Sequence, residues 1–221
     1  MLEANKSKLF EKLFYVYNTN LLKRRFHSFN VKGLKHLRQR QTSLPLIIYA
    51  NHSSWWDGLA AFQISYKTKL DSFVMMEEKQ LKRFFLFRKL GAFSIVRENP
   101  RLAMQSINYA VDLLKNSDRT LWIFPQGEIL PNDLRPLHFY RGLSKIIKKL
   151  GKCATVSLTF RYEFFNEFKP EIFANIKSPQ EISFENSKKL TAHFENKTVE
   201  NLEEIKKDIL NQQFDEYERI V

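Results

Sequence analysis

Short apolar segments alternate with longer amphipathic ones between residues 44 and 177, and this alternation limits the folds that the chain can adopt. Short apolar runs predict strands, and apolar residues at helical spacing predict helices. Predicted strands cover 44–50, 70–77, 91–97, 119–125, 153–165 and 169–177; predicted helices cover 7–26, 57–67, 79–90, 99–116, 143–151 and 200–218. The sequence therefore predicts an α/β fold, with a mainly parallel or mixed central sheet flanked by helices.

The first predicted helix is basic and amphipathic. Its apolar residues at helical spacing are Leu9, Phe10, Leu13, Phe14, Tyr17 and Leu21, and Ser7 is a suitable N-cap. Lysines occupy much of the other side, and a basic cluster at residues 23–25 ends the segment. Two interpretations remain open: the helix lies on a membrane surface, or its apolar face packs on the domain.

The charge balance indicates an anionic partner. The net charge is +12, and residues 1–50 contain ten Lys and Arg against two Glu, so +8 of it lies there. Such a surface suits an anionic membrane, a phosphorylated substrate or nucleic acid. We see no signal peptide and no run of the ~20 apolar residues that a membrane-spanning helix needs, so we expect peripheral membrane contact. The single Cys153 excludes an internal disulfide.

The segment NHSSWWD, residues 51–57, follows a predicted strand and leads into a predicted helix. A neutral imidazole can accept a proton from a hydroxyl near pH 7, and a carboxylate on its other nitrogen orients it. At a strand–turn–helix junction, Asp57 in the first helical turn can point back to His52. The alternative is that Asp57 caps the helix and His52 is a buried hydrogen-bonding residue. Of Trp55 and Trp56, we expect at least one to pack in the core.

The surroundings of His52 offer no evident nucleophile. Ser53 and Ser54 do not lie in a nucleophile-elbow sequence, and Cys153 lies inside an apolar strand. A His–Asp pair without a nucleophile suits direct activation of an external hydroxyl or water. The other four histidines are scattered without ligand-like spacing, so we expect no metal site.

Other polar residues follow predicted strands, as His52 does. Arg97 ends one strand, and residues 125–128 follow another. In α/β sheets, ligands collect at the carboxyl ends of strands. If these ends share one edge of the sheet, we expect the polar residues to converge.

Four segments together resemble a known family. NHSSWWD resembles the Asn-His-x-x-x-x-Asp block of the glycerolipid, or lysophospholipid, acyltransferase superfamily, which includes 1-acylglycerol-3-phosphate acyltransferases. GAFSIVR (91–97), IFPQGE (123–128) and FYRGLSKI (139–146) resemble its later blocks, in the same order. The resemblance covers about residues 30–165. It implies transfer of an acyl group from acyl-CoA or acyl-carrier protein to a lipid hydroxyl, with no further cofactor.

The resemblance also implies roles for individual residues. His52 would be the general base, Asp57 its orienting partner, and Arg97 would hold an anionic group of the acceptor. The candidate substrate-binding residues are Asn51, Ser54, Arg97, Gln126, Gly127, Glu128 and Arg141. We predict a membrane-surface helix over residues 1–29 and an acyltransferase domain over 30–221, on the cytoplasmic face of an anionic membrane and without a nucleic-acid partner.

The third block departs from the family pattern Glu-Gly-Thr-Arg. Gln126, Glu128 and Ile129 replace its glutamate, threonine and arginine. The lost arginine is a phosphate contact in the pattern, so Arg135 or Arg141 would have to replace it. Otherwise the acceptor is uncharged, such as a glycolipid or carotenoid glycoside. Two further alternatives are a thioesterase and a non-enzymatic basic module that binds membrane or nucleic acid.

Overall fold

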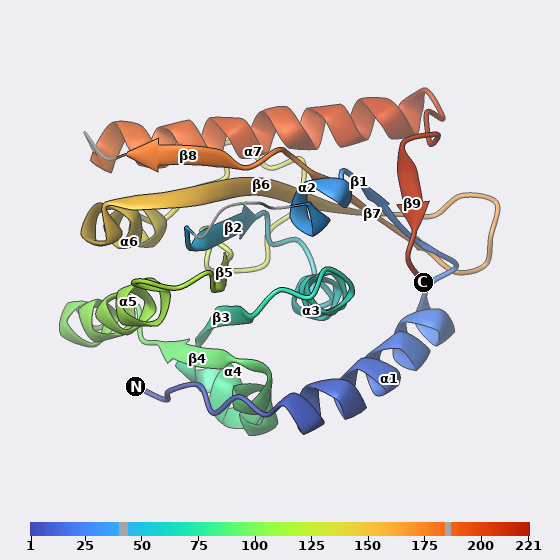
Figure 1. Cartoon of the computed structure of the whole chain (residues 1–221). Helices are drawn as coiled ribbons and strands as arrows, with labels where there is room; N and C mark the ends of the chain where they lie inside the picture. Colours follow the sequence, from blue (N-terminus) through green and yellow to red (C-terminus); the bar gives the residue numbers. More distant parts are fainter. Residues whose placement is uncertain (40–43, 184–186) are drawn as a thin grey trace.

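The computed structural model describes residues 1–39, 44–183 and 187–221. Within these residues, a central sheet is covered by helices on both faces (Figure 1). The strands are β1 Phe29–Lys32, β2 Leu46–Ala50, β3 Ser72–Glu77, β4 Ala92–Ile95, β5 Thr120–Ile123, β6 Lys152–Glu163, β7 Glu171–Ile176, β8 Gln180–Ser183 and β9 Tyr217–Arg219. The helices are α1 Lys8–Arg25, α2 Lys35–Arg38, α3 Asp57–Lys67, α4 Glu78–Arg83, the 3-10 helix η1 Phe85–Leu90, α5 Pro100–Leu114, α6 Gly142–Leu150 and α7 Ser187–Leu210.

The sheet is mixed, which confirms the predicted fold class. The strand order is β4-β3-β5-β2-β6-β7-β1-β9, and β8 pairs with β6. Strands β4, β3, β5, β2 and β6 are parallel to their neighbours in this run, whereas β6 and β7 are antiparallel. The carboxyl ends of β2, β4 and β5 therefore lie at one edge, as the positions of His52 and Arg97 in the sequence had led us to expect.

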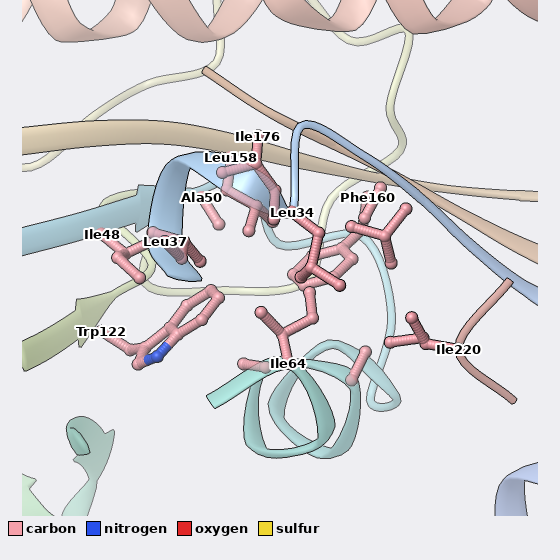
Figure 2. Packing of buried hydrophobic residues seen from close by; sticks show 14 of the residues in the cluster. Leu34, Leu37, Ile48, Ala50, Ile64, Trp122, Leu158, Phe160, Ile176 and Ile220 are labelled. Carbon is pink, nitrogen blue, oxygen red and sulfur yellow. The ribbon is translucent and has the colours of Figure 1, made fainter. Parts of the chain in front are cut away.

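Alternate residues of the central strands face opposite sides of the sheet, because side chains alternate along a strand. In β2, Ile48 packs with Trp122 of β5 and Ile64 of α3 on one face, as Figure 2 shows. Its neighbour Ile47 belongs to the cluster on the other face, which includes residues of α5, α6 and α7. Burial on both faces explains why β2 is continuously apolar in sequence.

Helix α1 begins as predicted, with the Ser7 hydroxyl accepting from the Phe10 amide. Its apolar side chains divide between two environments. Phe14 packs on Phe62 of α3 and Phe87 of η1, with ring centroids 5.0 and 5.9 Å away. The exposed apolar side chains of the helix are Leu9, Leu13, Val16 and Tyr17. None of the helices in the described ranges has the length and apolarity needed to span a bilayer.

The prediction of one helix over 79–90 is wrong. Helix α4 ends at Arg83, Phe84 leaves the helical conformation, and η1 follows. The break is accompanied by tertiary packing: the Phe84 ring lies beside Trp55 and Phe87, with centroids 5.9 and 5.4 Å away. The Phe87 amide donates to the Phe84 carbonyl, three residues back, as in a 3-10 helix.

The prediction of a helix over 200–218 is wrong at both ends. Helix α7 already begins at Ser187 and stops at Leu210, and residues 217–219 form β9, antiparallel to β1. Strand pairing with distant residues overrides the local helical pattern here, because β1 lies about 180 positions away and propensity alone cannot report it.

Candidate active site

His52 and Asp57 form a hydrogen-bonded pair at the carboxyl end of β2. His52 Nδ1 lies 2.8 Å from Asp57 Oδ2. Asp57 is the first residue of α3, so the turn between strand and helix reverses the chain and brings its carboxylate back to the imidazole. The Asp57 side chain is fully buried, and the His52 side chain is 23% exposed.

Three further donors hold the Asp57 carboxylate. Its Oδ2 accepts from the amides of Ser53 and Ser54, at 2.7 and 2.9 Å, and its Oδ1 accepts from the Tyr162 hydroxyl at 2.6 Å. Burial, followed by the Asp57 charge, raises the pKa of Tyr162 well above its ordinary value, so this phenol remains a donor. Both oxygens of the Asp57 carboxylate therefore accept hydrogen bonds.

This environment selects the histidine tautomer. An ionised carboxylate has no hydrogen to give, so the His52 Nδ1 must donate to Asp57. The hydrogen of the neutral ring is then on Nδ1, and Nε2 is a free base. The ring lines a cavity and packs beside Phe124, with centroids 4.7 Å apart, so Nε2 is the nitrogen available to a bound molecule.

The cavity beside His52 has a volume of about 1620 Å³. This exceeds the roughly 300–1,000 Å³ of ordinary small-molecule sites. Its apolar wall includes Phe14, Leu59, Phe62, Phe73, Met75, Phe87 and Ile107. The cations that line it are Lys6, Lys8, Lys12, Lys69, Arg83, Arg97, Arg141 and Lys145. The cavity therefore suits a ligand with a long apolar part and an anionic part.

Arg97 enters this cavity from the loop after β4. Its guanidinium lies over the Tyr140 ring, 5.4 Å from the centroid. It also packs against Gly127, whose φ is +69° and where an added Cβ would lie 2.3 Å from an Arg97 nitrogen. Only glycine fits at 127 with the arginine in this place. Among the described residues, no carboxylate pairs with Arg97 within 4 Å.

Glu128, Ile129 and Arg141 also line the cavity. Arg141 immediately precedes α6, whose N-terminus supplies further positive potential. Arg135, the other possible substitute for the missing arginine, points elsewhere: its guanidinium binds Glu203 at 2.7 Å and the carbonyls of Asn132 and Leu134.

Asn51, Ser54 and Gln126 do not line the cavity. The Asn51 side chain pairs with the backbone N–H and C=O of Phe160 at 2.8 and 3.0 Å, which ties the end of β2 to β6. The Ser54 hydroxyl accepts from the Trp56 amide, and Gln126 Oε1 accepts from the His52 amide at 2.7 Å. These three side chains thus hydrogen-bond to backbone groups near His52 and hold that segment in place.

One of the two tryptophans packs against the core, as expected. Trp56 packs edge-on against Phe26 at 5.0 Å and borders the core, whereas Trp55 is exposed and lines the cavity. In the described part of the chain, no group of three or more His, Cys, Asp or Glu side chains could hold a metal ion.

Sequence reasoning missed two residues of the site, Tyr162 and Lys145. Tyr162 lies 105 positions from Asp57, in a long strand that offers no local signal of this contact. Lys145 lines the cavity one helical turn after Arg141, and this i,i+4 spacing was a usable signal.

Comparison with known proteins identifies relatives of this chain. The acyltransferase family model matches residues 28–161. A 1-acyl-sn-glycerol-3-phosphate acyltransferase from Streptococcus pneumoniae is 30% identical over 156 residues, which are 68% of this chain and 55% of the relative. A putative 1-acyl-sn-glycerol-3-phosphate acyltransferase from Caenorhabditis elegans is 34% identical over 92 residues, 39% of this chain and 31% of the relative. The chain thus spans about half the length of the first curated relative and a third of the second.

The fold is also similar to a solved structure. The crystal structure of the 1-acyl-sn-glycerophosphate acyltransferase from Thermotoga maritima aligns with a TM-score of 0.66 and 18% identity, over 89% of this chain and 79% of that one. At this identity the likeness concerns the fold alone.

Proposed function

Because the chain belongs to the acyltransferase family, we propose that it transfers an acyl group from acyl-CoA or acyl-carrier protein to the hydroxyl of a lysophospholipid. The observation that carries this proposal is the His52–Asp57 pair, 2.8 Å apart, at the wall of a large apolar cavity. Both curated relatives are named for acylation of a phosphate-bearing glycerolipid, which supports the same acceptor class here.

The chemistry follows from the tautomer of His52. Nε2 accepts the proton of the acceptor hydroxyl while the oxygen attacks the thioester carbonyl carbon. Asp57 stabilises the imidazolium that forms. The tetrahedral intermediate collapses with cleavage of the carbon–sulfur bond, and the imidazolium returns the proton to the departing thiolate. The products are the acylated lipid and a free thiol, and no acyl-enzyme forms.

The cationic side of the cavity suits the phosphate of the acceptor. Arg97 has a guanidinium without a carboxylate partner in the described part of the chain, and Arg141 and Lys145 add charge at the start of α6. Guanidinium groups bind phosphate oxygens in a bidentate manner. These residues offer the positive charge that is missing at position 129, where isoleucine replaces the arginine of the family pattern.

An uncharged, sugar-bearing acceptor is the second candidate. Glu128 and Ile129 line the cavity where the family pattern has threonine and arginine. A carboxylate accepts hydrogen bonds from several hydroxyls and repels phosphate. A glycolipid acceptor would therefore use Glu128, whereas a phospholipid acceptor would use Arg97 and Arg141.

The exposed side of α1 suits a membrane surface. Leu9, Leu13, Val16 and Tyr17 form an exposed apolar stripe, and Lys8 and Lys12 are exposed beside it. Apolar residues flanked by lysines are typical of helices that lie in the bilayer interface. The lipid acceptor would then reach the cavity, which α1 borders, from that surface.

The test measures free thiol released from palmitoyl-CoA by the purified protein in mild detergent, with and without lysophosphatidic acid. Release that needs both the acceptor and His52, with His52→Ala as the comparison, is the expected result. Replacing the acceptor by a glycolipid distinguishes the second candidate.

Two results contradict the proposal. Thiol release that needs His52 but no acceptor identifies a hydrolase acting on water. Turnover of the folded His52→Ala protein near that of the wild type eliminates the general-base mechanism.

A further inference from the structure

The loop between β6 and β7 contains three exposed phenylalanines, of which Phe165, at 40%, is the least exposed. The other two, Phe164 and Phe168, are 73% and 99% exposed. Neither lines the cavity beside His52. Exposed aromatic side chains that gather on one loop commonly mark a contact with another surface.

The loop is held in place at both ends, so the two rings project from a fixed base. Phe165, between them, packs on Phe173 and Phe214, with centroids 5.9 and 6.1 Å away. At the other end, the Pro170 carbonyl accepts from the His27 amide at 2.9 Å. Exposure of the flanking phenylalanines is therefore a property of the ordered loop.

The loop lies beside the basic end of α1. Lys169 Nζ donates to the Lys23 carbonyl at 3.1 Å. Lys23, Arg24 and Arg25 are exposed, and neither they nor Lys169 pair with a carboxylate within 4 Å in the described part of the chain. Figure 1 shows the β6–β7 loop and the end of α1 on the same side of the molecule.

Two of the three glutamates around the loop are bound within the protein. Glu163 binds Arg161 at 2.5 Å, and Glu171 accepts from Ser28 and Asn30. Glu167 lies 3.6 Å from the His27 ring. In the described part of the chain, Glu167 is therefore the one carboxylate of these three without a hydrogen bond to another side chain, beside the four exposed cations Lys23, Arg24, Arg25 and Lys169.

We propose that the β6–β7 loop is a second membrane contact, which inserts Phe164 and Phe168 into an anionic bilayer while the basic turn at residues 23–25 binds its headgroups. This proposal rests on the proposed function in one respect: acylation of a membrane lipid is the reason for the protein to be at a lipid surface.

The charge of this region favours a bilayer as the occupant. Two exposed rings beside four unpaired cations complement an apolar layer under an anionic surface. The surface is also continuous with the exposed stripe of α1, because Leu9, Leu13, Val16 and Tyr17 are followed on the same helix by the basic turn.

The first test is co-sedimentation of the full chain with vesicles of phosphatidylcholine containing phosphatidylglycerol. Replacing both Phe164 and Phe168 by Ser should weaken binding about tenfold or more, because each ring loses its apolar burial. The matched control replaces both by Leu, which retains apolar side chains and should bind like the wild type. Vesicles without phosphatidylglycerol should bind the wild type weakly.

The second test places an environment-sensitive fluorophore on Phe168→Cys. Cys153 does not compete for the label, because it is buried and burial raises the pKa of its thiol to about 12. On addition of anionic vesicles, emission should shift to shorter wavelength. The control label at Lys149→Cys lies on α6, which precedes the opposite end of β6, and should not shift.

Two outcomes overturn the proposal: unchanged vesicle binding by the double Ser variant, or an unshifted label at 168 while the protein sediments with vesicles. In both cases a protein partner, and not a bilayer, would be the expected contact of the exposed rings. Failure of the proposed function is distinguishable, because it is measured by thiol release in detergent, where the double Ser variant should match the wild type.

Discussion

Replacing Asp57 by Asn tests the pair at the centre of the site with little change in shape. In the structure, Oδ2 accepts from His52 and from the amides of Ser53 and Ser54. An asparagine oxygen in this place keeps all three donors, so it keeps the Nδ1-H tautomer of His52. Its amide group then faces Tyr162, whose hydroxyl can turn to accept. The substitution therefore removes mainly the negative charge.

The distance sets the size of the expected effect. A full charge 2.8 Å from the ring nitrogen interacts with imidazolium by about 6 kcal/mol at an effective dielectric constant of about 20. If about half of the positive charge has developed in the transition state, the loss is about 3 kcal/mol. These values correspond to decreases in kcat/KM between about 10²-fold and 10⁴-fold.

The assay is acceptor-dependent thiol release, with the thermal midpoint measured in parallel. Asp208→Asn is the matched control, because Asp208 is also buried and accepts from Lys32 and the Tyr217 hydroxyl, but outside the cavity. It should lose stability and keep its kcat/KM. If folded Asp57→Asn stays within tenfold of the wild type, Asp57 does not stabilise the reaction as we reason.

Three further predictions use other contacts. Tyr162→Phe removes one donor to the Asp57 carboxylate and, on the proposed mechanism, should lower kcat about tenfold with little change in KM, measured by steady-state kinetics. Arg97→Ala should lower kcat/KM for lysophosphatidic acid about 10- to 100-fold, whereas Arg135→Ala, whose guanidinium binds elsewhere, should not; equal effects would refute an acceptor site at Arg97. Burial alone would raise the pKa of Glu204, but hydrogen bonds, first from Lys177, hold it below its usual range. Its stabilising contribution is therefore present above about pH 4.5 and is lost as pH falls through the lowered value, so thermal midpoints of Glu204→Gln should depend less steeply on acid pH.

Local patterns predicted several helix ends correctly, because a cap depends on neighbours in sequence. Ser7 caps α1, Asn99 caps α5 with Pro100 at its first position, and Gly151 ends α6. Where distant segments decide, the predictions were wrong. The break at Phe84 is accompanied by packing of its ring beside Trp55, and β9 depends on pairing with β1.

The family resemblance drawn from four ordered segments is confirmed by the family match over residues 28–161. For the site, spacing pointed to His52 and Asp57 because both lie at one strand–helix junction. The contacts of Gln126 and Asn51 were not predictable, since each depends on which backbone groups the folded sheet brings beside it.

The sequence by itself determined the α/β class and the basic, aromatic character of the N-terminal helix, and it placed His52 and Asp57 at one strand–helix junction, because each depends on residues near one another in the chain. Only the tertiary structure decided which residues share the cavity. It placed Tyr162 on the carboxylate of Asp57, aligned Arg97 with Gly127, and directed Arg135 away. The reason is that parallel strands bring distant chain segments to one edge of the sheet, and sequence separation contains no record of that proximity.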